Sequence, residues 1–237
     1  MRSSVTLRLV GEVAEIARGS HSRKSFRTAV TPLLARTLGF DCAVWTFAIQ
    51  PDWSDDSAFA WHFPIETVKL ARSRKTVIGE IAAAARQALE KGAIVNLGTT
   101  ARTRQKSALF NEIFWPAGLF SHVGLAFDIE SRQTLLSIAR ASGPGFGQSD
   151  ADAFNDVAPV LALSESLCAR RERGALSSAL TPRERDIAEL VERGLTNAEI
   201  AKVLGISKNT VRNRLAAAFE RTGSSNRAEL VARLHSE

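Results

Sequence analysis

The sequence predicts a mixed α+β chain, largely helical, with an N-terminal α/β sandwich around a central antiparallel sheet and a C-terminal domain of helices. Three observations lead to this fold class. The length of 237 residues suits two domains of unequal size. Helix and strand patterns alternate over residues 1–170, whereas residues 180–237 carry only helix signals.

The first part of the chain is predicted to form two helices and two strands. Apolar residues at helical spacing predict helices over residues 5–17 and 22–38, the second of which ends at a glycine. Short runs rich in aromatic and β-branched residues predict buried strands over residues 42–49 and 59–63. A polar loop over residues 51–56 separates these strands.

The middle of the N-terminal domain is predicted to be helical. Residues 65–91 have a helical pattern, either as one helix or as two helices broken near Gly79. A short apolar run follows at residues 93–97, then a polar basic segment at 99–106. Residues 107–114 are consistent with a short helix.

A hairpin and a long helix complete this domain. Strand patterns over residues 121–128 and 132–141 flank a tight connection, which is typical of a β-hairpin. A glycine-rich loop at residues 143–148 precedes a helix that Ser149 can cap and whose apolar positions extend to Leu167.

The domain boundaries follow from a change in composition after Cys168. A charged stretch and then small residues mark a linker at residues 171–179. We therefore expect an N-terminal domain over residues 1–170 and a helical domain over residues 180–237.

Local capping signals define the helices of the C-terminal domain. Thr181 and Glu184 form one pattern of a hydroxyl followed three residues later by a carboxylate, with proline at the first helical position. Thr196 and Glu199 repeat it, and Gly205 ends that second, short helix. A third helix begins after Ser207, so the spacing predicts a helix-turn-helix.

The third helix separates a packing face from an exposed face. The packing face is apolar and consists of Val211, Leu215, Ala218 and Phe219. The opposite face consists of Asn209, Arg212, Asn213 and Ala216. Between residues 208 and 227 the only acid is Glu220, against five basic residues: Lys208, Arg212, Arg214, Arg221 and Arg227. Basic residues concentrated on a helix after a short turn are typical of a segment that reads DNA.

The bulk composition agrees with a polyanionic partner. The formal net charge is +6, which permits binding to nucleic acid without proving it. Cys42 and Cys168 are the only cysteines, so a reducing compartment is expected. No apolar run is long enough to span a bilayer, so we expect a cytoplasmic protein without membrane contact.

The C-terminal segment resembles a known family. The run LTPRERDIAELVERGLTNAEIAKVLGISKNTVRNRL, followed by RTGSSNRAEL, is similar over its whole length to the DNA-binding domain of LuxR/FixJ-type transcriptional regulators. The resemblance implies a four-helix module in a bacterial regulator, a third helix that reads the major groove, and a homodimer on a two-fold site of double-stranded DNA. RNA polymerase is a further candidate partner.

The resemblance also implies which residues contact DNA. Arg212, Asn213 and Ala216 correspond to positions near the bases, with Arg212 suited to guanine and Asn213 to adenine. Lys208, Thr210 and Arg214 correspond to positions that hold the DNA backbone, and Thr196 and Asn197 are candidates for phosphate contacts at the start of the second helix. Asn209 and Arg227 complete the set of residues expected to bind DNA. Two departures stand out: Arg214 replaces a common histidine, and Gly223-Ser224-Ser225 lacks the usual apolar residue, which is expected to weaken packing of the last helix.

The N-terminal domain resembles GAF or PAS-like sensor domains through Leu38-Gly39-Phe40-Asp41 and through Phe146-Gly147-Gln148-Ser149-Asp150. A pocket for a small ligand would be lined by Trp45, Trp61, Phe63 and His122, although each is also a candidate for plain core. One alternative is an acyl-homoserine-lactone receptor, which the absence of tyrosine disfavours. Another is a ligand-free domain that serves dimerisation or protein docking.

Other functional classes lack a supporting residue pattern. A phosphoacceptor domain would need an acidic pair after its first strand, and Asp55 and Asp56 lie in a loop instead. His21, His62, His122 and His235 show no spacing typical of metal ligands. Because catalytic motifs and glycine-rich phosphate loops are absent as well, we expect no enzyme activity and no cofactor.

Overall fold

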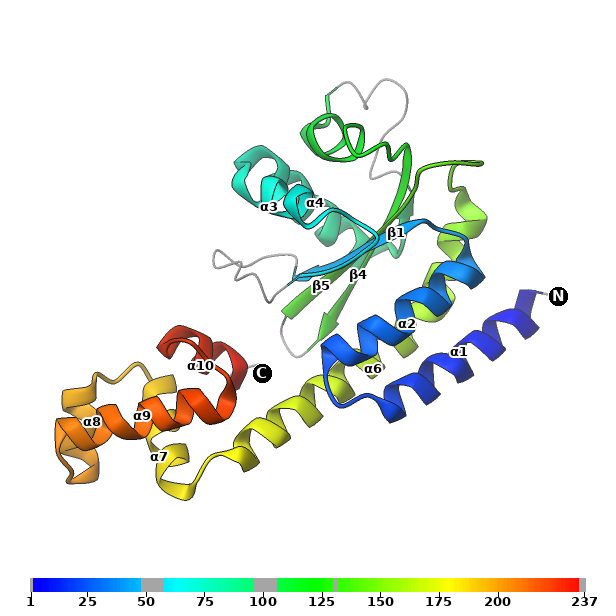
Figure 1. Ribbon diagram of the computed structural model, residues 1–237. Helices are drawn as coiled ribbons and strands as arrows, with labels where there is room; N and C mark the ends of the chain where they lie inside the picture. The colour runs from blue at the N-terminus through cyan, green and yellow to red at the C-terminus, as the bar shows by residue number, and fades with distance from the viewer. Residues whose placement is uncertain (1, 48–57, 96–105, 130–131, 235–237) are drawn as a thin grey trace. The chain divides into compact units, whose positions relative to one another are not determined.

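The computed structural model describes residues 2–47, 58–95, 106–129 and 132–234. The chain divides into two compact units, residues 1–167 and residues 168–237 (Figure 1). The first unit contains a sheet with helices on both faces, and the second contains helices only. The predicted α+β fold class is thereby confirmed.

Within the described residues, one antiparallel sheet of five strands forms the centre of the first unit, in the order β2-β1-β5-β4-β3. The strands are β1 (Cys42–Phe47), β2 (Phe59–Trp61), β3 (Ile94–Val95), β4 (Ser121–Ile129) and β5 (Arg132–Arg140). The predicted hairpin is confirmed, with Ser121 of β4 opposite Arg140 of β5. The loop predicted at residues 51–56, the strand end at 48–49 and the segment at 99–105 lie outside the described residues.

Helices cover both faces of this sheet. They are α1 (Arg2–Gly19), α2 (Arg23–Leu38), α3 (Ile65–Ser73), α4 (Lys75–Lys91) and α6 (Gln148–Ala179). α2 and α6 lie along one face, whereas α3 and α4 lie along the other (Figure 1). On the α2/α6 face, the Nε1 atom of Trp45 donates a hydrogen bond of 3.0 Å to Thr31 Oγ1 of α2. On the α3/α4 face, alanines of α4 pack against Ala126 and Leu135 of the hairpin.

Local signals fix the two ends of α2. Ser22 and Ser25 form a reciprocal capping box at its start. At its end, Gly39 adopts a left-handed conformation with φ of 68°, which a residue with a Cβ atom seldom adopts. The predicted bounds of this helix are confirmed, and its buried side, which includes Phe26, Val30 and Leu34, faces the core.

A buried ion pair joins α2 to α6. Arg27 Nε lies 2.7 Å from Glu165 Oε1, and Arg27 Nη2 lies 2.8 Å from Glu165 Oε2. The two side chains are only 5% and 0% exposed. The Arg27 guanidinium also lies 5.4 Å from the centre of the Trp45 ring, so the pair is part of the core rather than of the surface.

The helical segment at residues 65–91 breaks at Arg74 and not near Gly79. Arg74 has an extended backbone, with φ of −107° and ψ of 108°, while Gly79 lies inside α4. The break changes the chain direction so that Val68 of α3 and Val77 of α4 enter the same hydrophobic cluster. Tertiary packing therefore outweighs the weak helix propensity of glycine.

The short helix predicted at residues 107–114 is a π-helix, η3 (Leu109–Phe114). Glu80 of α4 accepts hydrogen bonds at its start from the backbone of Ala108 and Leu109, at 2.7 and 3.1 Å. Phe110 and Phe114 are buried in the cluster on the α3/α4 face of the sheet. The wider helical turn thus places these rings toward the core.

Arg140 connects the two segments that suggested a sensor-like domain. Its Nε donates to the carbonyl of Gly39, and its Nη2 lies 3.3 Å from Asp150 Oδ1. Its guanidinium lies 3.9 Å from the centre of the Phe146 ring. One arginine therefore holds the turn after α2 against the start of α6.

α6 is longer than the helix expected from the sequence and continues through residues 171–179, the segment predicted as a linker. After it, four shorter helices follow in the described part of the second unit: α7 (Pro182–Glu192), α8 (Asn197–Leu204), α9 (Lys208–Thr222) and α10 (Arg227–Leu234). Their core consists of aliphatic side chains from all four helices, among them Ile187, Ile200, Val211 and Leu230, each at most 1% exposed.

Candidate nucleic-acid interface

Two capping boxes orient the helices that lead into α9. At α7, the Thr181 backbone N–H donates to Glu184 Oε2 at 2.8 Å, and the Glu184 N–H donates to Thr181 Oγ1 at 3.4 Å. At α8, the Thr196 backbone N–H and hydroxyl both donate to Glu199 Oε2 at 2.7 Å. Both capping patterns predicted from the sequence are therefore confirmed. They satisfy backbone N–H groups that the start of a helix otherwise leaves unpaired.

A tight turn connects α8 to α9. Gly205 adopts a left-handed conformation with φ of 64°, and the Ile206 N–H donates to the carbonyl of Ala201 at 3.0 Å. Ser207 then caps α9 by accepting a hydrogen bond from the Thr210 N–H at 3.0 Å. A short helix, a glycine turn and a longer helix make up the helix-turn-helix geometry.

α9 presents one face to the core and one to solvent. Val211, Leu215 and Ala218 are buried among α7, α8 and α10, whereas Phe219 is half-buried at the edge of the same cluster. The exposed side carries the predicted contact residues Lys208, Asn209, Thr210, Arg212, Asn213, Arg214 and Ala216. The structure therefore brings these seven side chains together on the accessible surface of a single helix.

Glu184 connects the start of α7 to α9 although it is only 1% exposed. Its Oε2 atom lies 3.4 Å from Arg221 Nε. Burial raises the pKa of this carboxyl. Hydrogen bonds from Thr181 and the charges of Arg221 and Arg214 outweigh that effect, and the pKa lies below its ordinary value of 4.5. The carboxylate thus stays ionised and holds α9 against α7.

Asn197 and Arg227, both predicted to contact DNA, also take part in an internal network. The Arg227 guanidinium donates to the backbone carbonyl of Leu195 and, at 3.4 Å, to the carbonyl of Val191. Its Nη1 atom donates to Asn197 Oδ1 at 3.4 Å. Arg227 therefore joins α10 to the turn between α7 and α8, a role that sequence reasoning missed because no local pattern pairs residues so far apart in the chain.

Thr196, the remaining predicted backbone contact, is exposed at the start of α8. Ser224 stands where the family usually has an apolar residue. It is 7% exposed, its Oγ lies 3.0 Å from Thr222 Oγ1, and its N–H donates to the carbonyl of Phe219 at 2.9 Å. A polar contact thus takes the place of an apolar one after α9.

The four candidate ligand-binding residues of the first unit are not brought together. Trp45 and Trp61 lie on the face covered by α2 and α6, where Trp61 packs edge-on against Phe40. Phe63 and His122 lie on the other face, and both pack against Phe114, with the His122 ring stacked at 4.4 Å. Trp45 is fully buried, so these aromatic residues belong to two different cores.

Two further observations bear on the other functional classes. Among the described residues, no group of three or more His, Cys, Asp or Glu side chains is arranged to hold a metal ion, and His235 lies outside them. Across that same part of the chain, no helix has the length and apolar character needed to cross a membrane.

Comparison with known proteins agrees with this geometry. Residues 178–234 match the family model described as bacterial regulatory proteins, luxR family. The spore germination protein GerE of Bacillus subtilis is 42% identical over 55 residues, which cover 23% of this chain and 74% of GerE. An HTH-type transcriptional regulator of Mycobacterium bovis is 31% identical over 142 residues, 57% of this chain, and this chain spans only 14% of that protein's length.

Among solved structures, the crystal structure of Escherichia coli SdiA aligns with 99% of this chain and 95% of its own, with a TM-score of 0.49 and 16% identity. The family assignment comes from the C-terminal residues. The chain belongs to the luxR family of bacterial regulatory proteins, and its C-terminal unit is that family's helix-turn-helix DNA-binding domain.

Proposed function

We propose that this regulator binds a two-fold DNA site as a dimer, with α9 of each copy in the major groove. The observation that carries the proposal is the sidedness of α9, whose apolar face is buried while its basic and amide side chains are exposed. A helix of this kind, held rigidly by its neighbours, can present side chains to base edges.

The exposed face divides by chemistry into base readers and backbone contacts. The Arg212 guanidinium can pair with the O6 and N7 atoms of guanine, and the Asn213 amide can pair with the N6 and N7 atoms of adenine. Ala216 lies one turn further along and can contact a thymine methyl group. Lys208 and Arg214 supply charge for phosphates.

Hydroxyl and amide groups would add phosphate contacts without carrying sequence information. Thr210 lies in the first turn of α9, where backbone N–H groups also point outward, and Asn209 adjoins it. Thr196 is the N-cap of α8, beside the outward-pointing N–H groups of that helix. Arg227 and Asn197 contribute mainly by fixing the turn between α7 and α8.

The N-terminal unit is proposed to serve as the dimerisation platform. This reading is favoured over a small-molecule pocket lined by the four aromatic candidates, because Trp45 and Trp61 lie on the opposite face of the sheet from Phe63 and His122. The buried Arg27–Glu165 pair favours a rigid domain of this kind, since such pairs constrain how helices pack.

The test is selection of bound DNA fragments by the full-length protein at a fixed salt concentration, followed by affinity measurements on the recovered sequence. We expect a two-fold motif. Arg212→Ala and Asn213→Ala should each cost about 1–3 kcal/mol of discrimination at one position in each half-site. Arg183→Ala is the matched control, because Arg183 is an exposed arginine on α7 that lies outside the exposed face of α9.

Unchanged sequence preference in both Arg212→Ala and Asn213→Ala would show that other residues read the bases. Recovery of single half-sites by a protein that binds as one copy would contradict the dimer. The first result would overturn the assignment of the base-reading residues, and the second would overturn the dimer.

A further inference from the structure

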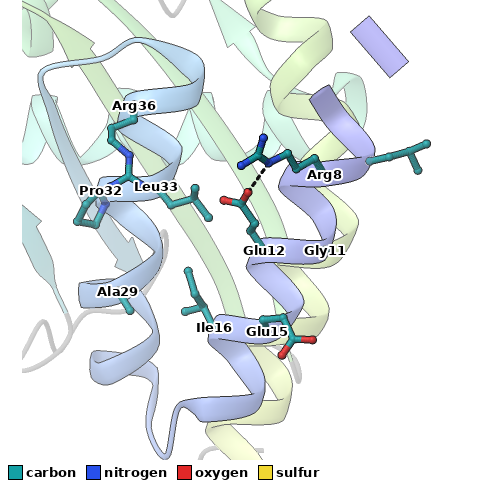
Figure 2. Close-up of a pocket in the computed structure, with 10 residues that line it drawn as sticks. Arg8, Gly11, Glu12, Glu15, Ile16, Ala29, Pro32, Leu33 and Arg36 are labelled. Atoms are coloured by element: carbon teal, nitrogen blue, oxygen red, sulfur yellow. Dashed lines mark hydrogen bonds and ion pairs between the residues drawn. The ribbon is translucent and has the colours of Figure 1, made fainter. Parts of the chain in front are cut away.

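An open groove of about 600 Å³ lies between α1 and α2 on the surface of the first unit (Figure 2). α2 contributes one wall, with Ala29, Pro32, Leu33 and Arg36. α1 contributes the other wall, with Leu7, Arg8, Gly11, Glu12, Glu15 and Ile16. These six residues recur at the spacing of one helical face, so α1 turns a continuous stripe toward the groove.

Two features of this stripe have no explanation within the chain itself. Leu7 is 72% exposed, the most exposed of the large apolar side chains in the described part of the molecule. Gly11 lies in the middle of α1, where glycine disfavours the helix, and a Cβ atom built on it would meet nothing within 4 Å. A bare stretch of helix backbone allows another helix to approach closely.

The stripe is also complementary to itself. An antiparallel copy of α1, related by a two-fold axis that passes between Gly11 and Glu12, would place Arg8 opposite Glu15 and Leu7 opposite Ile16. Figure 2 shows Arg8 toward one end of this face and Glu15 and Ile16 toward the other. A two-fold interface requires this self-complementarity, because the same patch serves both subunits.

We infer that a second copy of this chain docks in the groove, with the two α1 helices packed antiparallel across the two-fold axis. This inference rests on the proposed dimer and specifies its surface. Opposite charges meet at both ends of the helix pair, and an apolar contact lies beside each. At the centre each Gly11 lies opposite Glu12 of the second copy, and that Glu12 is paired with Arg8 of its own chain at 2.8 Å. The observations that carry it are the charge arrangement, the exposed Leu7 and the unfilled space over Gly11.

The decisive experiment is a charge swap in the full-length protein, with molecular mass measured by sedimentation equilibrium. Arg8→Glu places two carboxylates opposite each other at both ends of the helix pair, and Glu15→Arg places two guanidinium groups there. Each variant alone should therefore associate at least about tenfold more weakly than the unmodified protein. An equimolar mixture should recover the dimer, since one end then pairs the two new charges and the other keeps the original pair. Raising the salt concentration should reduce these differences.

Matched controls separate this contact from a general charge effect. Lys24→Glu and Glu90→Arg make the same charge changes at exposed helix positions outside the groove and should leave the association constant unchanged. Gly11→Leu provides a test independent of charge. A Cβ atom at this position meets nothing within 4 Å in its own chain, and leucine favours a helix more than glycine does. The variant should therefore fold and melt no lower than the unmodified protein, yet lose the dimer.

The outcomes separate the α1–α1 contact surface from the dimer itself. If the unmodified protein is a dimer and Arg8→Glu, Glu15→Arg and Gly11→Leu all associate normally, the dimer stands but uses another surface. If the unmodified protein remains a monomer at every concentration and binds DNA as one copy, both are wrong. Recovery of the dimer only in the mixture would establish the antiparallel pairing.

Discussion

The carboxylate of Glu165 accepts two hydrogen bonds from the guanidinium of Arg27, although the two residues lie 138 positions apart in the sequence. Both side chains are almost completely withdrawn from solvent. Because a charge in such a place requires its partner, the pair ties α2 and α6 to one relative position along their axes.

Glu165→Ala should lower the free energy of unfolding of the N-terminal unit by about 3–5 kcal/mol, because it leaves the buried Arg27 without its carboxylate. The measurement is urea denaturation followed by tryptophan fluorescence. Glu66→Ala removes an exposed ion pair with Lys69 and should cost less than about 1 kcal/mol. The double variant Arg27→Met/Glu165→Leu should regain most of the loss, and a double variant as unstable as Glu165→Ala would contradict this account.

The DNA-binding domain should lose stability in acid through Glu184. Its pKa is below 4.5 in the folded domain and returns to that ordinary value on unfolding. The contribution to stability is therefore complete above about pH 4.5 and disappears as the pH falls through the folded pKa. Between pH 7 and pH 4, the melting temperature of Glu184→Gln should fall less than that of the unmodified protein. Glu189→Gln, exposed on the same helix, should follow the unmodified protein.

Arg227 and Arg214 should respond differently to substitution. Arg227→Ala removes hydrogen bonds to the turn between α7 and α8, so it should lower the melting temperature of the domain and weaken DNA binding without changing its salt dependence. Arg214→Ala should reduce the slope of log affinity against log salt by about one at little cost in stability. A normal melting temperature together with a reduced salt slope in Arg227→Ala would instead assign Arg227 to phosphate.

Cys42 should be unreactive in the folded protein. Burial, reinforced by the charge of Asp41, raises the pKa of its thiol to about 12, so almost no thiolate exists near neutral pH. In a Cys168→Ala background, a thiol reagent at pH 8 should modify Cys42 only after denaturant is added. Rapid modification under native conditions would mean that β1 opens readily.

Sequence reasoning succeeded where the signal was local. The capping boxes at Thr181 and Thr196 and the left-handed glycines at the ends of α2 and α8 depend on residues within one turn, and all were predicted with the helices that they begin or end. The hairpin of β4 and β5 is local as well. The exposed face of α9 followed from helical spacing alone.

Sequence reasoning was wrong, or made no prediction, for features that depend on contacts between segments far apart in the chain. Trp61 and His122 lie on opposite faces of the sheet, and this placement depends on how the strands align. A shift of one residue in the alignment of a strand would move its side chains to the other face of the sheet. Arg27 and Glu165 lie on the apolar stripes of α2 and α6, where a charge is unexpected, and only the packing of α2 on α6 brings the two charges together. For residues 65–91 the sequence leaves open one helix or a break near Gly79, because glycine is the stronger local signal. The structure has the break at Arg74, where it allows Val68 and Val77 to share one core.

Arg227 and Leu230 limit how short a fragment can be and still fold as a DNA-binding domain in another protein. A fragment ending after α9 would retain the base-reading positions, yet it would lack the side chain that fastens the α7–α8 turn and a leucine that is 0% exposed in the domain core. Fusions of α9 to a foreign scaffold should therefore carry α10 with them. The specificity of this regulator is portable as a four-helix unit and not as a recognition helix.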